Sequence, residues 1–99
     1  MTMYPSPKYH SFRSEKYLDF IRSKNCLVCG NINTVAHHEG LGRNAQGAKP
    51  PDSHAVPLCN RCHQRRHDKG VQSFWGGWDV KMEIIWLLGE YIRCQENTY

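Results

Sequence analysis

Two segments decide the fold: Cys26-Leu-Val-Cys29 and Cys59-Asn-Arg-Cys62-His63-Gln-Arg-Arg-His67. In each segment two residues separate a pair of cysteines, and this gap allows both sulfurs of a pair to bind one tetrahedral ion. Four thiolates leave no open coordination position, so the spacing predicts a structural Zn²⁺. Two reduced, packed pairs or a redox-active dithiol are the alternative interpretations. The expected zinc ligands are Cys26, Cys29, Cys59 and Cys62.

The size of the chain also favours a metal. It has 99 residues, of which 39% are hydrophobic, so we expect one domain with a modest core. Chains this short usually need disulfides, a metal ion or a partner chain to stabilise their fold. Five Cys with six His favour a metal ion in that role. No apolar run is long enough to span a membrane, and Met1–His10 lacks the apolar core of a secretory signal. We therefore expect a cytoplasmic protein without membrane contact, where paired cysteines more often bind zinc than form disulfides.

The hydrophobic pattern predicts an α+β fold with one domain over residues 14–99, after a flexible N-terminal arm over residues 1–13. A first helix is expected from Ser14, its N-cap, to near Asn25. Two short strands are expected over residues 34–38 and 55–58. Between them, residues 39–51 contain three glycines and two prolines and predict a basic loop.

The second strand leads into a helix that carries His63 and His67, and Trp75-Gly-Gly-Trp78 predicts a turn after it. A last helix is expected over about residues 79–94, with Asp79 as its N-cap. We interpret the tryptophans as packing residues rather than base-stacking platforms, with Trp86 on the apolar side of the last helix. That side is wide enough for either the core or a dimer face, and its stripe consists of Val80, Ile84, Leu87, Leu88 and Tyr91.

The histidines are the most informative residues outside the cysteine pairs. His37 and His38 are adjacent on a predicted strand and therefore point to opposite faces, so that one can bind metal while the other faces substrate. His63 and His67 lie one helical turn apart and can hold a divalent ion together. With His37 they would form a three-imidazole site. Its ion would keep open coordination positions, which is typical of a catalytic rather than a structural metal site. In the alternative interpretation His63 replaces one Cys at the zinc, and the other histidines are surface residues.

These motifs resemble those of the HNH (His-Me finger) nucleases, which have a ββα-metal fold, over about residues 26–67. The matching residues are the first Cys pair, Ala36-His37-His38, and His54-Ala-Val-Pro-Leu-Cys59 with the Cys62-His63-x3-His67 that follows. The short chain, the Gly47–Asp52 segment and Ile85-Trp86-Leu87 resemble more narrowly the small prophage-encoded HNH proteins of the YbcO and DUF968 type, relatives of the phage recombination-enhancement nuclease. The resemblance implies a zinc-stapled, treble-clef-like ββα-metal core with flanking helices.

The resemblance also implies a role for each histidine. His38 falls on the general base that activates water, and His37 on a metal ligand. His63 and His67 fall on ligands of the same catalytic ion. His54 stands where the family usually has Asn, which orients the catalytic histidine through hydrogen bonds; an imidazole can donate or accept one such bond.

The function that follows is a metal-dependent DNA endonuclease of low sequence specificity, in phage recombination or repair. The catalytic ion would be Mg²⁺ or another divalent ion such as Mn²⁺, Ni²⁺ or Zn²⁺, because imidazole ligands suit the transition metals better. The net charge of +4 suits a polyanionic partner such as DNA. The expected phosphate contacts, each of which is equally interpretable as a solvated surface charge, are Arg43, Lys49, Arg61, Arg65 and Arg66.

Two other functions fit parts of the pattern. One is a non-catalytic, zinc-stabilised DNA-binding module, and the other is a protein-interaction adaptor for which the positive charge is incidental. Neither needs the His37-His38 pair or the His63-x3-His67 spacing. The family resemblance further implies a recombinase filament on DNA as a possible partner.

Overall fold

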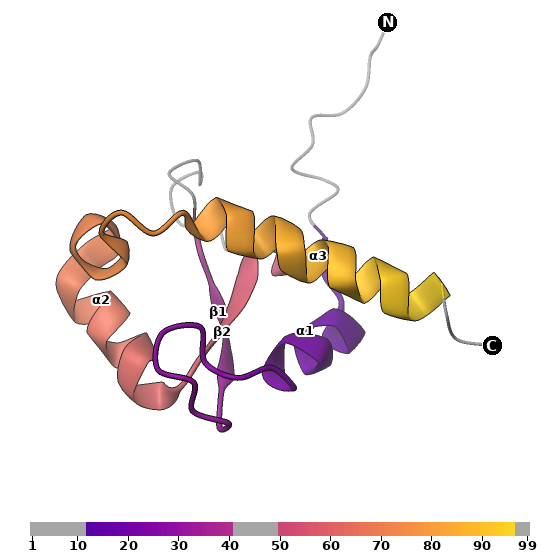
Figure 1. Cartoon of the computed structure of the whole chain (residues 1–99), viewed down its shortest axis with the longest axis horizontal. Coiled ribbons are helices and arrows are strands. Elements are labelled where there is room, and N and C mark those ends of the chain that lie inside the picture. The colour runs from indigo at the N-terminus through magenta and orange to yellow at the C-terminus, as the bar shows by residue number, and fades with distance from the viewer. Residues whose placement is uncertain (1–11, 41–49, 97–99) are drawn as a thin grey trace, which may run out of the picture.

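The computed structural model describes residues 12–40 and 50–96 (Figure 1). The predicted α+β class is confirmed, since these residues form a two-stranded sheet surrounded by helices. In chain order the elements are α1 (Glu15–Arg22), β1 (Val35–His38), the short 3₁₀ helix η2 (Asp52–His54), β2 (Ala55–Leu58), α2 (Asn60–Trp75) and α3 (Val80–Glu96).

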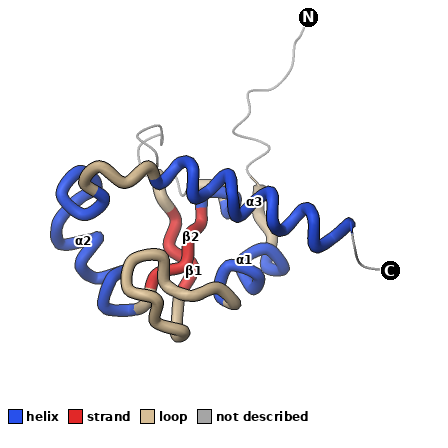
Figure 2. The backbone as a smooth tube through the Cα atoms, viewed as in Figure 1, coloured by secondary structure: helices blue, strands red, loops and turns tan. Residues whose placement is uncertain are grey.

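The two strands form the centre of the molecule. They pair antiparallel, with Val35 opposite Leu58 and His38 opposite Ala55. Every residue of β2 is buried, because α2 lies on one side of the strand pair while α1 and α3 lie on the other (Figures 1 and 2). The antiparallel pairing therefore places the end of β1 beside η2 and the start of β2, although 13 residues lie between His38 and Asp52 in the sequence.

Local sequence signals explain the ends of α1 and α3. Ser14 caps α1, since its Oγ accepts a hydrogen bond from the backbone N–H of Tyr17 at 3.0 Å. α1 ends at Arg22 rather than near Asn25. Asp79 caps α3 as predicted, because its Oδ1 accepts from the N–H of Lys81 at 3.1 Å.

The core lies between α1, α3 and the strand pair. Tyr17 is fully buried in α1 and packs edge-on against Tyr91 of α3, with ring centroids 4.9 Å apart. The remaining buried hydrophobic residues of the described chain are Leu18, Ile21, Cys26, Ala55, Val56, Leu58, Cys59, Cys62, Trp75, Val80, Ile84 and Leu87.

Helix α2 contains a kink. Gly70 has φ of 83° and ψ of 171°, a left-handed backbone region that side chains other than glycine's disfavour. The kink redirects the chain so that Trp75 returns to the core, and the Gly76–Gly77 turn follows it. Trp75 and Trp78 pack edge-on with centroids 5.7 Å apart, so their predicted packing role is confirmed.

Three expectations differ from the structure. Trp86 is 70% exposed on α3, so its prediction as a residue of the packed side was wrong. Glu39, assigned to a basic loop, is buried at the end of β1. In the predicted arm, residues 1–11 lie outside the described chain, whereas the carbonyl oxygen of Phe12 accepts a hydrogen bond from the N–H of Asp52 at 2.8 Å. None of the described helices is long and apolar enough to cross a membrane.

Candidate metal centres

The four predicted zinc ligands converge at one point. Their sulfur atoms all lie within 4.8 Å of one another, and the Sγ atoms of Cys29 and Cys59 are 3.5 Å apart. Four thiolates at the usual Zn–S distance of about 2.3 Å lie about 3.8 Å from each other in a tetrahedron. The donor set and its spacing therefore fit a structural zinc ion.

Backbone hydrogen bonds hold both halves of this cluster in place. The N–H of Gly30, which has φ of 80°, donates to the carbonyl oxygen of Cys26 at 3.0 Å and closes the first turn. The N–H of Leu27 donates to the carbonyl oxygen of Pro57 at 3.1 Å and ties this turn to β2. The second Cys pair opens α2, so one ion at the cluster would join the turn before β1 to the first turn of α2.

The surroundings of the cluster also shift the pKa values of its thiols. Burial opposes ionisation of Cys26, but hydrogen bonds from backbone groups, that of Cys29 first, outweigh it and lower the pKa to about 6. Burial and the neighbouring thiols raise the pKa of Cys62. A lowered pKa favours the thiolate, which is the form of cysteine that binds zinc.

The three predicted imidazole ligands form a second cluster. The Nδ1 atoms of His37 and His63 are 3.1 Å apart, and the Nε2 atoms of His63 and His67 are 3.2 Å apart. One nitrogen of each ring lies within 4.8 Å of the others, as a shared ion would require. Burial and the neighbouring histidines lower the pKa of His63, which favours the neutral form that binds metals. His37 is buried and His67 exposed, so the cluster opens to solvent on the α2 side.

Glu39 is hydrogen-bonded to this cluster from the protein interior, and the sequence pattern did not predict this role. Its side chain is 1% exposed and accepts hydrogen bonds from His37 Nε2 at 2.9 Å and Trp75 Nε1 at 2.7 Å. Arg66 donates to the same carboxylate from Nε at 2.8 Å and Nη2 at 3.2 Å. Burial alone would raise the pKa of Glu39, but these donors lower it to about 2. The carboxylate fixes the ring of His37 so that Nδ1 points to His63, the usual arrangement behind a metal-bound histidine.

His38 faces a different carboxylate, as its alternation with His37 predicts. Its Nε2 lies 2.8 Å from Oδ1 of Asp52, which is itself buried. Oδ2 of Asp52 accepts from the backbone N–H of Ser14 at 2.7 Å. Burial opposes ionisation of Asp52, but the hydrogen bonds from His38 and Ser14 and the charge of Arg13 lower its pKa. The ionised Asp52 carboxylate can accept a hydrogen bond from His38 Nε2–H and thereby fix the orientation of the ring.

His54 does not contact the ring of His38 among the described interactions. Its Nδ1 lies 3.2 Å from the carbonyl oxygen of Glu39, and its own carbonyl oxygen accepts from the N–H of Glu39 at 3.2 Å. His54 therefore links the residue that follows β1 to the last residue of η2, the short helix that also carries Asp52. This position can orient His38 only through the backbone.

The predicted phosphate contacts fall into three groups. Arg43 and Lys49 lie outside the described residues. Arg61 and Arg65 are exposed on α2. Arg66 differs from expectation, because its guanidinium is committed to Glu39 and its side chain is only 14% exposed.

One of the two carboxylates, Glu39, could have been found from the sequence. Residues two apart on a strand share a face, so Glu39 lies on the same side as His37 if β1 extends one residue further. Asp52 carried no such signal, since it reaches His38 only because η2 follows a long connection back to the end of β1.

These features define a class: a small α+β protein whose described residues bring together a four-cysteine cluster and a three-histidine cluster. The chain belongs to the family described as "Protein of unknown function (DUF968)", which matches residues 1–82. It is 30% identical over 80 residues to the "Uncharacterized protein YdfU" of Escherichia coli (strain K12). The alignment covers 80% of this chain and 23% of that protein, so the chain spans under a quarter of its relative's length. No solved structure matches the chain.

Proposed function

We propose that the protein is a metal-dependent DNA endonuclease of the HNH type, with a ββα-metal core formed by β1, β2 and α2. The observation that carries the proposal is the placement of two sets of groups at one end of β1. His37, His63 and His67 converge on one point, and His38, the next residue of β1, is held by the Asp52 carboxylate. A purely structural zinc domain needs neither set.

His38 is the general base in this proposal. Its side chain is 16% exposed, and with Nε2 bonded to Asp52, Nδ1 of the neutral ring is the nitrogen that would take the proton of a water molecule. Asp52 stabilises the imidazolium that forms, because its charge lies 2.8 Å from the opposite nitrogen. Hydrolysis of the phosphodiester follows when the activated water attacks phosphorus and the bond to the leaving sugar oxygen breaks.

The residues that would hold the catalytic ion are His37, His63 and His67. A divalent ion bound there supplies charge stabilisation for the scissile phosphate and the departing oxygen. Glu39 keeps His37 in the ligating orientation through a buried hydrogen bond. Three neutral imidazoles favour Mn²⁺, Ni²⁺ or Zn²⁺ over Mg²⁺, which prefers oxygen ligands.

The DNA backbone is the substrate that the surface charge suits. Arg61 and Arg65 lie exposed on α2, the helix that supplies two of the three imidazoles. Contacts from such side chains to phosphates carry no sequence information, so cleavage is weakly sequence-specific. The family resemblance adds phage recombination or repair as the biological setting, with a recombinase filament as the partner.

The test is cleavage of supercoiled plasmid and single-stranded DNA by the zinc-loaded protein, with Mg²⁺, Mn²⁺ or Ni²⁺ added. His38→Ala, purified identically, is compared with Lys81→Ala, which changes an exposed residue of α3 far from the histidines in the chain. We expect metal-dependent cutting by the wild type and Lys81→Ala, and a loss of at least about 100-fold in His38→Ala.

Equal cleavage by His38→Ala and the wild type would overturn the proposed base. No cleavage by any protein, tested also on DNA coated with a recombinase, would overturn the nuclease proposal. Salt-sensitive DNA binding without cleavage would then identify a zinc-stabilised DNA-binding module. Absence of both would favour a protein-interaction adaptor.

A further inference from the structure

Trp75 is joined to the histidine cluster through one atom of Glu39, and the chemistry proposed above gives this tryptophan no role. Its side chain is 6% exposed, and its indole Nε1–H donates to Oε2 of Glu39 at 2.7 Å. The same oxygen accepts from Nε2 of His37 at 2.9 Å. A buried indole N–H needs a hydrogen-bond partner, but any carbonyl oxygen would satisfy it. Here the partner is the carboxylate that holds one of the three imidazoles.

The break in α2 at Gly70 brings Trp75 to this carboxylate. Arg66 and Trp75 are nine residues apart, and at about 100° per residue a straight helix would point them in opposite directions. Both nevertheless donate to Oε2 of Glu39, Arg66 from Nε at 2.8 Å. Gly70 has φ of 83°, which residues with a Cβ disfavour, although a Cβ there would meet no atom within 4 Å. The turn of the backbone, and not close packing, therefore requires this glycine.

The carboxylate of Glu39 is consequently held from two separate parts of α2. Arg66 also donates to Oε1 from Nη2 at 3.2 Å, while Trp75 makes the shortest of the described bonds, to Oε2. Because His37 shares Oε2, a shift of this oxygen would turn the imidazole and move its Nδ1 relative to that of His63, 3.1 Å away. The partners behind a ligating histidine set the orientation of its ring, and their loss lowers metal affinity for this reason.

We propose that Trp75 is a positioning residue of the histidine site. Its N–H holds the Glu39 carboxylate at the place from which His37 can bind a divalent ion together with the other two imidazoles. This role rests on the metal site of the proposed function. It also explains why α2 turns back at Gly70, although residues 71–75 contain no His, Cys, Asp or Glu.

Calorimetric titration of the zinc-loaded protein with Ni²⁺ tests this role. Trp75→Phe keeps an aromatic ring but removes the N–H, and we expect the dissociation constant for Ni²⁺ to rise about three- to tenfold. The loss is smaller than the roughly 10- to 100-fold usual for a direct partner of a metal ligand, because Trp75 acts one hydrogen bond further from the ion. The zinc content stays at one ion per chain, since the four cysteines are unchanged.

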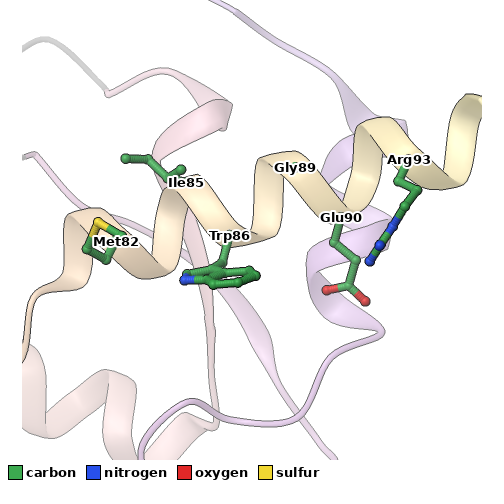
Figure 3. A pocket seen from close by; sticks show the side chains of 6 residues that line it. All are labelled: Met82, Ile85, Trp86, Gly89, Glu90 and Arg93. Carbon is green, nitrogen blue, oxygen red and sulfur yellow. The ribbon is translucent and has the colours of Figure 1, made fainter.

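Trp86→Phe is the matched control. Trp86 is 70% exposed on α3, where it lines a shallow pocket with Met82 and Arg93 (Figure 3). The described residues that line this pocket include no histidine. The same substitution there should leave the affinity for Ni²⁺ unchanged, and an equal loss in both variants would overturn the positioning role.

A double-mutant cycle separates positioning from a general loss of packing. In the His37→Ala background the carboxylate no longer holds a metal ligand, so Trp75→Phe should change the weaker remaining Ni²⁺ affinity by less than about twofold. A packing change in α2 would instead act on His63 and His67 in both backgrounds. An effect of Trp75→Phe that is the same with and without His37 would therefore overturn the proposal.

A measurement on the wild type alone covers the case in which a variant does not fold. By thermodynamic linkage, a hydrogen bond that favours binding of the ion is itself strengthened by the ion to the same extent. Addition of a second equivalent of Zn²⁺, which is diamagnetic, should therefore slow hydrogen exchange of the Trp75 indole N–H about three- to tenfold in proton NMR spectra. Exchange of the Trp86 indole N–H should not change.

The outcomes distinguish this role from the proposed function. A wild type that binds no second ion overturns the histidine metal site and the role of Trp75 together. A wild type that binds Ni²⁺ no better than Trp75→Phe does overturns the role of Trp75 alone. An indole N–H whose exchange is the same with and without the second Zn²⁺ does so as well.

Discussion

The buried carboxylate of Glu39 permits a quantitative prediction. In Glu39→Gln the side chain keeps its size but loses its charge, and its new NH₂ group faces the donors of Arg66, Trp75 or His37. Removing one partner of a buried ion pair costs about 3–5 kcal/mol, because the other charge stays buried without compensation. Glutamine retains one acceptor oxygen, so we expect the free energy of unfolding to fall by about 3 kcal/mol.

The pKa of Glu39 gives the same magnitude independently. The structure lowers it from 4.5 to about 2, so the ionised carboxylate stabilises the folded state by about 3 kcal/mol at neutral pH. Because the pKa is lower in the folded state, this stability is present above the unfolded value of 4.5 and is lost as the pH falls toward 2. The advantage of the wild type over Glu39→Gln therefore shrinks by about 1 kcal/mol by pH 4 and about 2 kcal/mol by pH 3.

Urea unfolding of the zinc-loaded proteins, followed by circular dichroism, measures this difference at each pH. Acid also protonates the thiolates in both proteins, so the difference between the two isolates the contribution of Glu39. Glu15→Gln is the control, because Glu15 is exposed and its pair with Arg22 contributes less than about 0.5 kcal/mol. Equal stability of Glu39→Gln and the wild type, or a difference that stays constant with pH, would refute the reasoning.

Four further predictions concern the two clusters and the surface of α2. Cys59→Ser, or prolonged chelation, should remove the zinc and unfold the protein, which metal analysis and circular dichroism would show; a folded, zinc-free protein would contradict the structural role of the cluster. His67→Ala should weaken binding of a second divalent ion at least about tenfold while one zinc per chain is retained, and calorimetry with Mn²⁺ or Ni²⁺ measures this; unchanged affinity would remove His67 from the site. Asp52→Asn should lower the rate of DNA cleavage at least about tenfold with DNA affinity unchanged, whereas equal rates would show that Asp52 does not position His38. Arg61→Ala together with Arg65→Ala should weaken DNA binding and reduce its salt dependence, as a fluorescence titration at several salt concentrations would reveal, and an unaltered salt slope would exclude both side chains from the interface.

The elements that local signals encode were predictable from the sequence. Ser14 and Asp79 are N-caps with a side-chain oxygen at the right position, and both cap their helices in the structure. The strand over residues 55–58 has the predicted bounds. The cysteine pairs and the histidine spacing likewise predicted two clusters. Metal ligands within one segment follow short, regular spacings, and these can be recognised whatever the length of the loop between the segments.

The residues that sequence reasoning missed depend on contacts between distant segments. Arg66 was interpreted as a phosphate contact because its partner Glu39 lies 27 residues away, on the other side of the cluster. Trp86 was assigned to the packed side of α3 because a helix with two apolar faces gives no sequence signal for which face meets the core. The kink at Gly70 was also not predicted. A glycine inside a helical pattern is tolerated more often than it bends the helix, so no signal in the sequence marked a break there.

The junction between β2 and α2 has a consequence for how the two clusters would respond to metal supply. Cys62 and His63 are neighbours, and the N–H of His63 donates to the carbonyl oxygen of Cys59 at 2.8 Å, so the first turn of α2 belongs to both clusters. An ion at the cysteines would order this turn and thereby set the position of an imidazole in the second cluster. By thermodynamic linkage, occupancy of each site would then raise the affinity of the other. Metal starvation would accordingly empty the exposed histidine site first and retain the cysteine-bound ion longest, so the protein would lose the proposed nuclease activity well before it lost its fold.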